Sequence, residues 1–264
     1  MTAPDATAQQ LLANRAAARP VANADWQQSG LAPGDQDAGY LTQDAVISIL
    51  EGQGQSPIGY KIGATNQTAR GLLGVDQPFY GRLIDATTSQ GPGRLAMIPG
   101  LHEVAEPEIA VRIGRDLDPS EAPFDAAAIE AATDALIPAI EIIISPFEPW
   151  MDAGAPSLIA DNGAHGSWIM GAPVTDWSGF DVLDGEIQVT VTGAEPATGR
   201  GGAVDGGPFA ATAWLANKLA ARGRALKAGD HVSTGTVTPP IKLFPGQRID
   251  ADYGALGQIS LAVD

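Results

Sequence analysis

Short apolar runs separated by glycine and proline make up most of the chain after Pro57. Runs of this length that end at turn-forming residues are typical of β-strands. The expected strands are 58–62, 80–84, 108–113, 138–144, 167–171, 186–192, 231–234, 241–243, 248–252 and 258–263. We expect three helices among them, at 66–73, 125–136 and 209–222. So many short strands in a chain with 32 Gly and 20 Pro favour a mixed, rolled or barrel-like sheet of the α+β class over a doubly wound parallel sheet.

The beginning of the chain has a different pattern. An Ala-, Gln- and Leu-rich stretch at 6–18 predicts a helix that ends at the following proline. Thr42 is a residue type that favours the N-cap position, and we expect it to begin a second helix. The sequence therefore predicts a small helical N-terminal region, 1–55, followed by a β-rich domain, 56–264.

Composition excludes several classes of function. The formal net charge of −16 makes the chain a poor partner for nucleic acid or for an anionic membrane surface. The absence of cysteine excludes disulfides, cysteine-bound zinc, iron–sulfur clusters and thiol nucleophiles. No apolar run approaches the roughly 18 residues of a membrane span. The start of the chain lacks the basic and apolar regions of a signal peptide, so we expect a cytoplasmic protein.

Three glutamates in two of the expected strands are the strongest candidates for chemistry. Glu106 and Glu108 are two residues apart, so both side chains point to the same side of a strand. Glu141 interrupts the apolar run 138–144, where a carboxylate is costly without a partner. If the three converge, they require a cation between them, and a hard divalent ion such as Mg²⁺ prefers oxygen ligands of this kind. The alternative is that Glu106 and Glu108 line a solvated strand face and Glu141 pairs with a lysine or arginine.

Other polar residues carry weaker signals. Lys61 lies within an expected strand, either as a lysine that reaches from a strand edge to solvent or as a cation beside a metal-bound anion. Asp161 and Asn162 follow an apolar run and alone indicate a turn. The three histidines lack the spacing of a helical zinc site, and each alone favours a structural role. The GxSxG, Walker A and GxGxxG motifs are absent, which points towards metal-assisted acid–base chemistry.

A series of short motifs resembles the 2-hydroxypenta-2,4-dienoate (2-keto-4-pentenoate) hydratases of the fumarylacetoacetate hydrolase superfamily. The matching segments occur in order from about residue 58 to the C-terminus. They are 60–63 (YKIG), 73–78 (LGVDQP), 106–110 (EPEIA), 137–141 (IPAIE), 159–164 (IADNGA), 213–219 (AWLANKL) and 226–230 (LKAGD).

The resemblance implies a mixed β-roll with flanking helices, a small helical N-terminal region and a homo-oligomer that acts on a small organic acid. It implies that Mg²⁺ or Mn²⁺ is held by Glu106, Glu108 and Glu141. It assigns catalysis to Lys61 and Asp161. It assigns substrate contacts to Phe79, Asn162, Thr234 and Thr236, the last two in a Ser-Thr-Gly-Thr turn that implies a site for the substrate carboxylate.

The implied activity is a metal-dependent lyase that adds water to a 2-hydroxy-2,4-dienoate or 2-oxo-4-enoate from the meta-cleavage catabolism of aromatic compounds. Two departures from the family pattern bear on this. Many hydratases have an acid where this chain has Phe79, and the segment 78–81 is closer to that of 2-oxo-3-hexenedioate (4-oxalocrotonate) decarboxylases. Residues 1–101 contain no histidine, which argues against the carbon–carbon hydrolases of the superfamily. A non-catalytic binder of 2-oxo acids is the remaining alternative.

Overall fold

The computed structural model of the chain describes residues 3–26, 31, 34–99 and 101–264. The N-terminal elements are α1 (Ala3–Ala16), β1 (Val21–Ala22), α2 (Asn23–Trp26) and α3 (Gln36–Gly52). The following elements are β2 (Pro57–Gly63), α4 (Gln67–Leu73), β3 (Phe79–Ile84), β4 (Thr88–Gln90), β5 (Gly93–Leu95), β6 (His102–Ile113), α5 (Ala126–Ala132) and β7 (Thr133–Ser145). Next come β8 (Phe147–Glu148), the 3-10 turn η4 (Trp150–Asp152), α6 (Ala155–Ala160), the 3-10 turn η5 (Asn162–Ala164), β9 (His165–Met170), β10 (Ile187–Val191) and β11 (Ala197–Gly199). The last are α7 (Gly207–Ala220), β12 (His231–Thr236), β13 (Ile241–Lys242), β14 (Arg248–Asp252) and β15 (Gln258–Val263).

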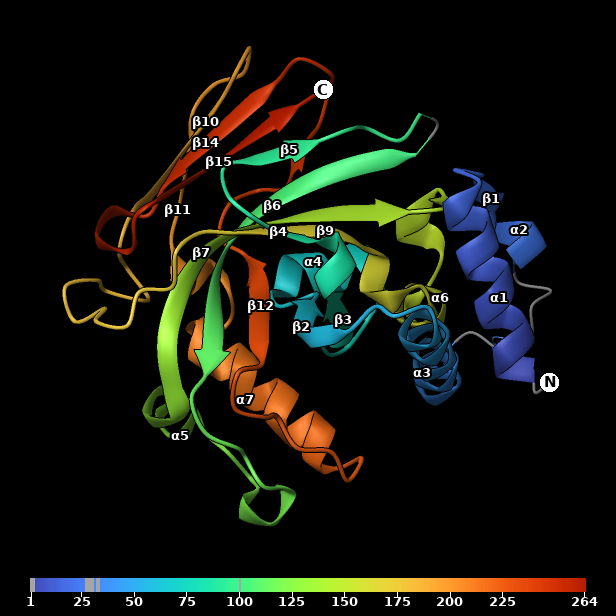
Figure 1. Cartoon of the computed structure of the whole chain (residues 1–264), viewed down its shortest axis with the longest axis horizontal. Coiled ribbons are helices and arrows are strands. Elements are labelled where there is room, and N and C mark those ends of the chain that lie inside the picture. The colour runs from blue at the N-terminus through green and yellow to red at the C-terminus, as the bar shows by residue number, and fades with distance from the viewer. Residues whose placement is uncertain (1–2, 27–30, 32–33, 100) are drawn as a thin grey trace.

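A large mixed sheet forms the centre of the molecule. Its strand order is β3-β2-β12-β6-β7-β9-β4, and β13 pairs with one end of β6. The neighbours of β6 and β7 are antiparallel to them, whereas β12 runs parallel to β2 and β4 parallel to β9. Figure 1 shows the long strands β6 and β7 curving through the sheet, with α5 and α7 near one end and α1 to α3 on the other side of the molecule. The expected rolled sheet of the α+β class is confirmed.

A second sheet, of order β11-β10-β14-β15-β5, lies above β6 and β7 in the view of Figure 1, on the side away from α5 and α7. Its strands alternate between buried and exposed residues, as in β10, where Ile187, Val189 and Val191 are buried and the residues between them are exposed. Such alternation is expected of a sheet with one face on the core and one in solvent. The buried Tyr253 hydroxyl donates a hydrogen bond of 2.8 Å to the Ala139 carbonyl of β7, which ties the two sheets together.

The structure corrects two details of the expected elements. The helix expected at 125–136 ends at Ala132, because residues from Thr133 onwards pair with β6 and extend β7. The helix expected to begin at Thr42 begins at Gln36 instead, with the Asp35 carboxylate accepting a hydrogen bond from the Ala38 amide. The short helix α6 was not expected, since six residues carry too little periodicity to indicate one.

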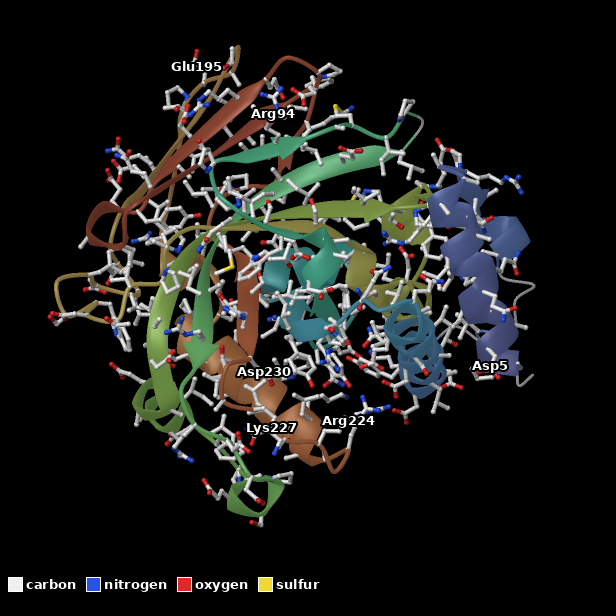
Figure 2. All side chains as sticks on the ribbon, viewed as in Figure 1. Asp5, Arg94, Glu195, Arg224, Lys227 and Asp230 are labelled. Carbon is white, nitrogen blue, oxygen red and sulfur yellow. The ribbon has the colours of Figure 1, made fainter. Side chains whose placement is uncertain are left out.

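The N-terminal helices pack against the β-rich part of the chain. Helix α3 contacts both α1 and α6. Arg224, labelled beyond the end of α7 in Figure 2, donates to both carboxylate oxygens of Asp44 on α3 at 2.8 and 2.7 Å. The division at 55/56 therefore remains a proposal, and residues 1–2, 27–30 and 32–33 of its first part lie outside the described structure. None of the helices among the described residues has the length and apolar character needed to cross a membrane.

Candidate active site

Three carboxylates meet where β6 and β7 pair. The register of the two strands places Glu106 opposite Glu141, and Glu108 follows on the same side of β6. One carboxylate oxygen from each of the three lies within 4.8 Å of the others. Glu108 and Glu141 are fully buried, and Glu106 is half-buried. The structure thus brings together the three acids that the sequence singled out.

The electrostatics of this cluster favour a positive charge among the three carboxylates. Burial raises the pKa of Glu106 to about 7, a shift that nearby Lys61 partly offsets. Burial, with the charges of Glu141 and Glu106, raises the pKa of Glu108 well above its usual range. Oε1 of Glu108 is buried and has no hydrogen-bond partner among the described residues. An unpartnered carboxylate oxygen beside two further carboxylates fits a hard divalent cation, so the residues present match the implied metal.

The second oxygen of Glu108 is held by β12. The Ser233 hydroxyl and, at 3.0 Å, the Gly235 amide both donate to Oε2 of Glu108. Gly235 has φ +114°, and a Cβ there would lie 1.9 Å from Oγ1 of Thr65, so this position requires glycine. These two donors fix the Glu108 carboxylate through Oε2 and leave Oε1 without a hydrogen-bond partner among the described residues.

Glu141 is held by a lysine and a histidine. Nζ of Lys61 lies 3.2 Å from Oε2 of Glu141 and also donates to the Gly163 carbonyl at 3.0 Å. Nδ1 of His165 lies 2.9 Å from Oε1 of Glu141. Burial acts to raise the pKa of Glu141, but Lys61 and His165 outweigh it and lower that pKa. Glu141 is therefore ionised, and the buried Lys61 lies beside it.

Asp161 and Asn162 are buried close to this cluster but point elsewhere. Arg15 of α1 contacts both carboxylate oxygens of Asp161 at 2.6 and 2.8 Å. The Asn162 side chain accepts from the Arg82 amide at 2.7 Å and donates to the Arg82 carbonyl at 2.9 Å, which fixes η5 to β3. Both side chains are thus engaged with other parts of the protein.

Three other residues were expected to contact the substrate, and they differ in their placement. Thr234 is fully buried and donates to the Ile109 carbonyl at 2.7 Å, a bond between β12 and β6. Thr236 and Phe79 each line a cavity next to Glu106. Thr236 donates to the Thr238 carbonyl at 2.7 Å, and Phe79 packs against Gly63.

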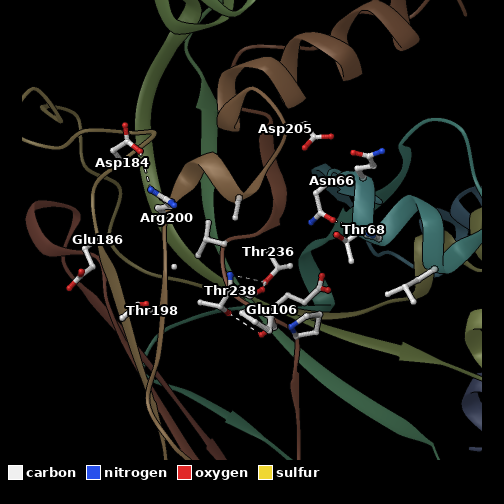
Figure 3. Close-up of a pocket in the computed structure, with 18 residues that line it drawn as sticks. Asn66, Thr68, Glu106, Asp184, Glu186, Thr198, Arg200, Asp205, Thr236 and Thr238 are labelled. Atoms are coloured by element: carbon white, nitrogen blue, oxygen red, sulfur yellow. Dashed lines mark hydrogen bonds and ion pairs between the residues drawn. The ribbon is translucent and has the colours of Figure 1, made fainter.

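Two cavities adjoin at Glu106. The first, of about 540 Å³, has Lys61 and Glu106 in its wall and is otherwise mostly apolar; we call it the apolar cavity. Its large apolar residues are Leu72, Leu73, Phe79, Ile143, Trp150, Met151 and Leu158. The second, of about 760 Å³, is the polar cavity, and Figure 3 shows Glu106 pointing into it with Asn66, Thr68, Thr236 and Thr238 around it. The candidate metal centre therefore lies between a polar and an apolar space.

Sequence reasoning missed Arg15, His165, Ser233 and Gly235 as parts of this site. Ser233 and Gly235 were noted only as part of a turn expected to hold the substrate carboxylate. Their contact with Glu108 follows from the pairing of β12 with β6, which no local pattern reveals. The same holds for His165, which meets Glu141 because β9 pairs with β7.

Comparisons with known proteins agree with this geometry. No protein-family model matches the chain. The chain is 32% identical over 259 residues to 2-keto-4-pentenoate hydratase 2 of Dechloromonas aromatica, an alignment that covers 98% of this chain and 96% of that protein. The chain belongs to the 2-keto-4-pentenoate hydratase family. It is therefore an enzyme of the hydro-lyase type, and the family expected from the motifs is confirmed.

Comparison with solved structures identifies the fold of the chain. The 4-oxalocrotonate decarboxylase of Pseudomonas putida G7, complexed with magnesium and adipate, matches with a TM-score of 0.89 and 26% identity over 99% of this chain and 97% of that one. A fumarylacetoacetate hydrolase family protein of Yersinia pestis matches with a TM-score of 0.61 and 16% identity, covering 79% of this chain and 94% of that one. This hydratase-family chain thus has the fold of the fumarylacetoacetate hydrolase superfamily.

Proposed function

We propose that this protein is a divalent-metal-dependent hydratase that adds water to a 2-hydroxy-2,4-dienoate, or to its 2-oxo enoate form. The proposal rests on one observation: three convergent carboxylates, one of them paired with a buried lysine, lie between an apolar and a polar cavity. The family supports the reaction, because the Dechloromonas aromatica relative, which aligns over 259 residues, is a 2-keto-4-pentenoate hydratase.

We assign the metal, Mg²⁺ or Mn²⁺, to Glu106, Glu108 and Glu141. A divalent cation held there would supply the positive charge that favours binding of an anionic 2-oxo acid and would offset the negative charge that develops during the reaction. Ser233 and Gly235 hold Glu108 in position, and Lys61 with His165 keeps Glu141 ionised. The magnesium complex of the related decarboxylase supports this choice of metal.

Lys61 is the proposed proton carrier. The dienol loses the proton of its C2 hydroxyl and gains one at C5, which leaves a C3–C4 double bond conjugated with the new oxo group. Water then adds its hydroxyl at C4 and its hydrogen at C3. Lys61 lines the apolar cavity and bears a transferable proton beside the substrate site, which suits it to the first of these steps.

The remaining expected residues receive narrower roles in the proposal. Thr236 lines the polar cavity and reaches the substrate carboxylate by exchanging its hydrogen bond to the Thr238 carbonyl, whereas Phe79 forms part of the apolar wall. Asp161 and Asn162 act as positioning residues rather than as direct catalysts, because Arg15 and the backbone of β3 occupy their polar atoms. Thr234 fastens β12 to β6 beneath the metal ligands.

Decarboxylation of a 2-oxo-3-hexenedioate is the second candidate. It is favoured by the match to the decarboxylase of Pseudomonas putida G7 and by Phe79, where many hydratases have an acid. Both reactions use the same stabilised enolate, so the metal centre alone does not separate them.

Product analysis separates the two candidates. The protein with Mg²⁺ is incubated with 2-hydroxypenta-2,4-dienoate and, separately, with 2-oxo-3-hexenedioate, and loss of the dienol absorbance is followed together with CO₂ release. The proposal predicts a 4-hydroxy-2-oxo acid from the first substrate and no CO₂ from the second. Release of CO₂ without hydration would instead establish the decarboxylase.

Homo-oligomeric assembly belongs to the same proposal and is tested by light scattering. The cytoplasmic location expected from the sequence remains a prediction.

A further inference from the structure

The apolar cavity has a buried end and an open end. Lys61, at the buried end, is only 2% exposed. Leu72 of α4 and Met151 of η4 line the same cavity and are 65% and 44% exposed, so they mark its mouth. Helix α4 and turn η4 contact each other, so these two apolar residues border the same opening. A substrate whose head lies at Lys61 and Glu106 must therefore direct its tail past Leu72 and Met151.

The charged residues of this cavity do not favour a second carboxylate on the tail. Lys61 is engaged by Glu141, and the other lysine in the wall, Lys242, is exposed with Nζ lying 5.4 Å from the centre of the Phe244 ring. Two further acids line the cavity beyond the metal ligands, Glu103 and Glu148. An acidic tail would lose water and meet more negative than positive charge, which is unfavourable in a largely apolar space.

The size of the cavity exceeds the needs of a five-carbon acid. Such an acid has about eight non-hydrogen atoms and fills less than half of the cavity at roughly 30 Å³ per atom, the share of a water molecule in the liquid. The cavity volume is about 540 Å³, within the range of sites that enclose considerably larger ligands. The extra space is walled by Trp150, Met151 and Leu158, so an apolar group fills it best.

We infer that this enzyme acts on 2-hydroxydienoates with an uncharged apolar tail longer than that of a five-carbon acid, and that Trp150 and Met151 select this tail. The inference rests on the proposed function, since it assumes that the head of the substrate lies at the carboxylate cluster. It also bears on the choice of reaction. A decarboxylase substrate must carry a second carboxylate that leaves as CO₂, and the wall of this cavity opposes that group.

Binding of three stable 2-oxo acids tests the inference. Pyruvate supplies the head alone, 2-oxooctanoate adds an apolar tail and 2-oxoadipate adds an acidic one. Each is titrated by calorimetry into the full-length protein with saturating Mg²⁺. We expect 2-oxooctanoate to bind about tenfold or more tightly than pyruvate, because its tail leaves water, and 2-oxoadipate to bind no more tightly than pyruvate. Tighter binding of 2-oxoadipate than of 2-oxooctanoate, or equal binding of pyruvate and 2-oxooctanoate, would overturn the inference.

A pair of lysine substitutions adds a matched control. Met151→Lys places a cation at the mouth of the apolar cavity and should reverse the preference, so that 2-oxoadipate binds more tightly than 2-oxooctanoate. Leu183→Lys introduces a lysine at a leucine that lines a different cavity and is 47% exposed, compared with 44% for Met151. This variant should keep the wild-type preference. An unchanged preference in Met151→Lys would remove that residue from tail selection.

The pyruvate titration separates this inference from the proposed function. Failure of pyruvate itself to bind would contradict the proposed function, whereas pyruvate binding without a gain from the apolar tail contradicts this inference alone.

Discussion

Arg15 of the N-terminal helix α1 forms a two-pronged ion pair with the fully buried Asp161, at 2.6 and 2.8 Å. The same guanidinium donates to the carbonyls of His165 at 2.9 Å and Ile144 at 2.8 Å. His165 in turn contacts Glu141 through its ring. A residue near the start of the chain therefore holds the segment that positions a proposed metal ligand.

Replacing Arg15 by methionine should destabilise the protein and weaken its metal site. The change leaves Asp161 as an unpaired buried carboxylate, and breaking a buried pair on one side costs about 3–5 kcal/mol. We expect that loss in the free energy of unfolding by urea, and a weaker Mn²⁺ affinity by calorimetry because His165 and Glu141 lose their support. Arg94→Met, which breaks the exposed pair with Asp264, is the control and should change neither quantity appreciably. Unchanged Mn²⁺ affinity in a folded Arg15→Met protein would show that Arg15 serves stability alone.

Glu108→Gln should have opposite effects on stability and on metal binding. The substitution removes a carboxyl group whose ionisation is opposed by burial and by two other carboxylates, so the metal-free protein should unfold at a higher temperature than the wild type. Mn²⁺ affinity and turnover should fall together, because a neutral amide is a poorer ligand than a carboxylate. Glu130→Gln, an exposed change on α5, is the matched control. If Glu108→Gln lowered the stability of the metal-free protein, the account of charge repulsion in the cluster would be wrong.

The stability of the metal-free protein should fall as the pH rises above about 6.5. Burial raises the pKa of Glu106 to about 7 and that of Glu108 well above its usual range, whereas both titrate near 4.5 in the unfolded chain. These two glutamates add protons to the folded protein between about pH 5 and pH 8. The lowered pKa values of His165 and His231 act in the opposite direction up to their ordinary value of 6.5, so stability should decrease with rising pH above that value. The lowered pKa of Glu141 acts only below 4.5, outside this window.

Thermal denaturation after EDTA treatment, over this pH range, measures that effect. Adding Mg²⁺ should raise the melting temperature more at pH 8 than at pH 5, since protons compete with the metal for the same carboxylates. A stabilisation by Mg²⁺ that did not depend on pH would contradict the assignment of the cation to these glutamates.

Lys61→Met should separate catalysis from metal binding. Loss of the proton carrier should lower kcat by at least about 100-fold. Mn²⁺ affinity should change far less than kcat, because the bound cation itself keeps Glu141 ionised once the positive charge of Lys61 is gone. Lys227→Met removes an exposed lysine paired with Asp116 and should leave both measurements unchanged. A parallel loss of metal affinity and turnover in Lys61→Met would indicate a structural role for this lysine.

The cluster of three carboxylates could be predicted from the sequence because its signals are local. Glu106 and Glu108 carry the period of a strand, and Glu141 stands alone in an apolar run. The groups that orient them could not be predicted in this way. Ser233 and His165 reach the glutamates only through the pairing of strands far apart in the chain.

Two residues suggested by the family resemblance have partners that the sequence does not indicate. Asp161 and Asn162 lie near the cluster, but their polar atoms contact Arg15 and Arg82, which no motif in the sequence links to them. Strand pairing between distant segments, which local sequence does not reveal, also explains why the helix expected at 125–136 ends early. Its alanine-rich sequence favours a helix throughout, but pairing with β6 outweighs helix propensity from Thr133 onwards.

A crystal structure of the protein soaked with Mn²⁺ and oxalate, with anomalous diffraction recorded, tests the central claim most directly. The account predicts a single strong anomalous peak between β6 and β7, about 2.1 Å from an oxygen of each of Glu106, Glu108 and Glu141, with oxalate completing its coordination. An anomalous map with no peak at this position, or with the peak bound by other residues, would contradict it.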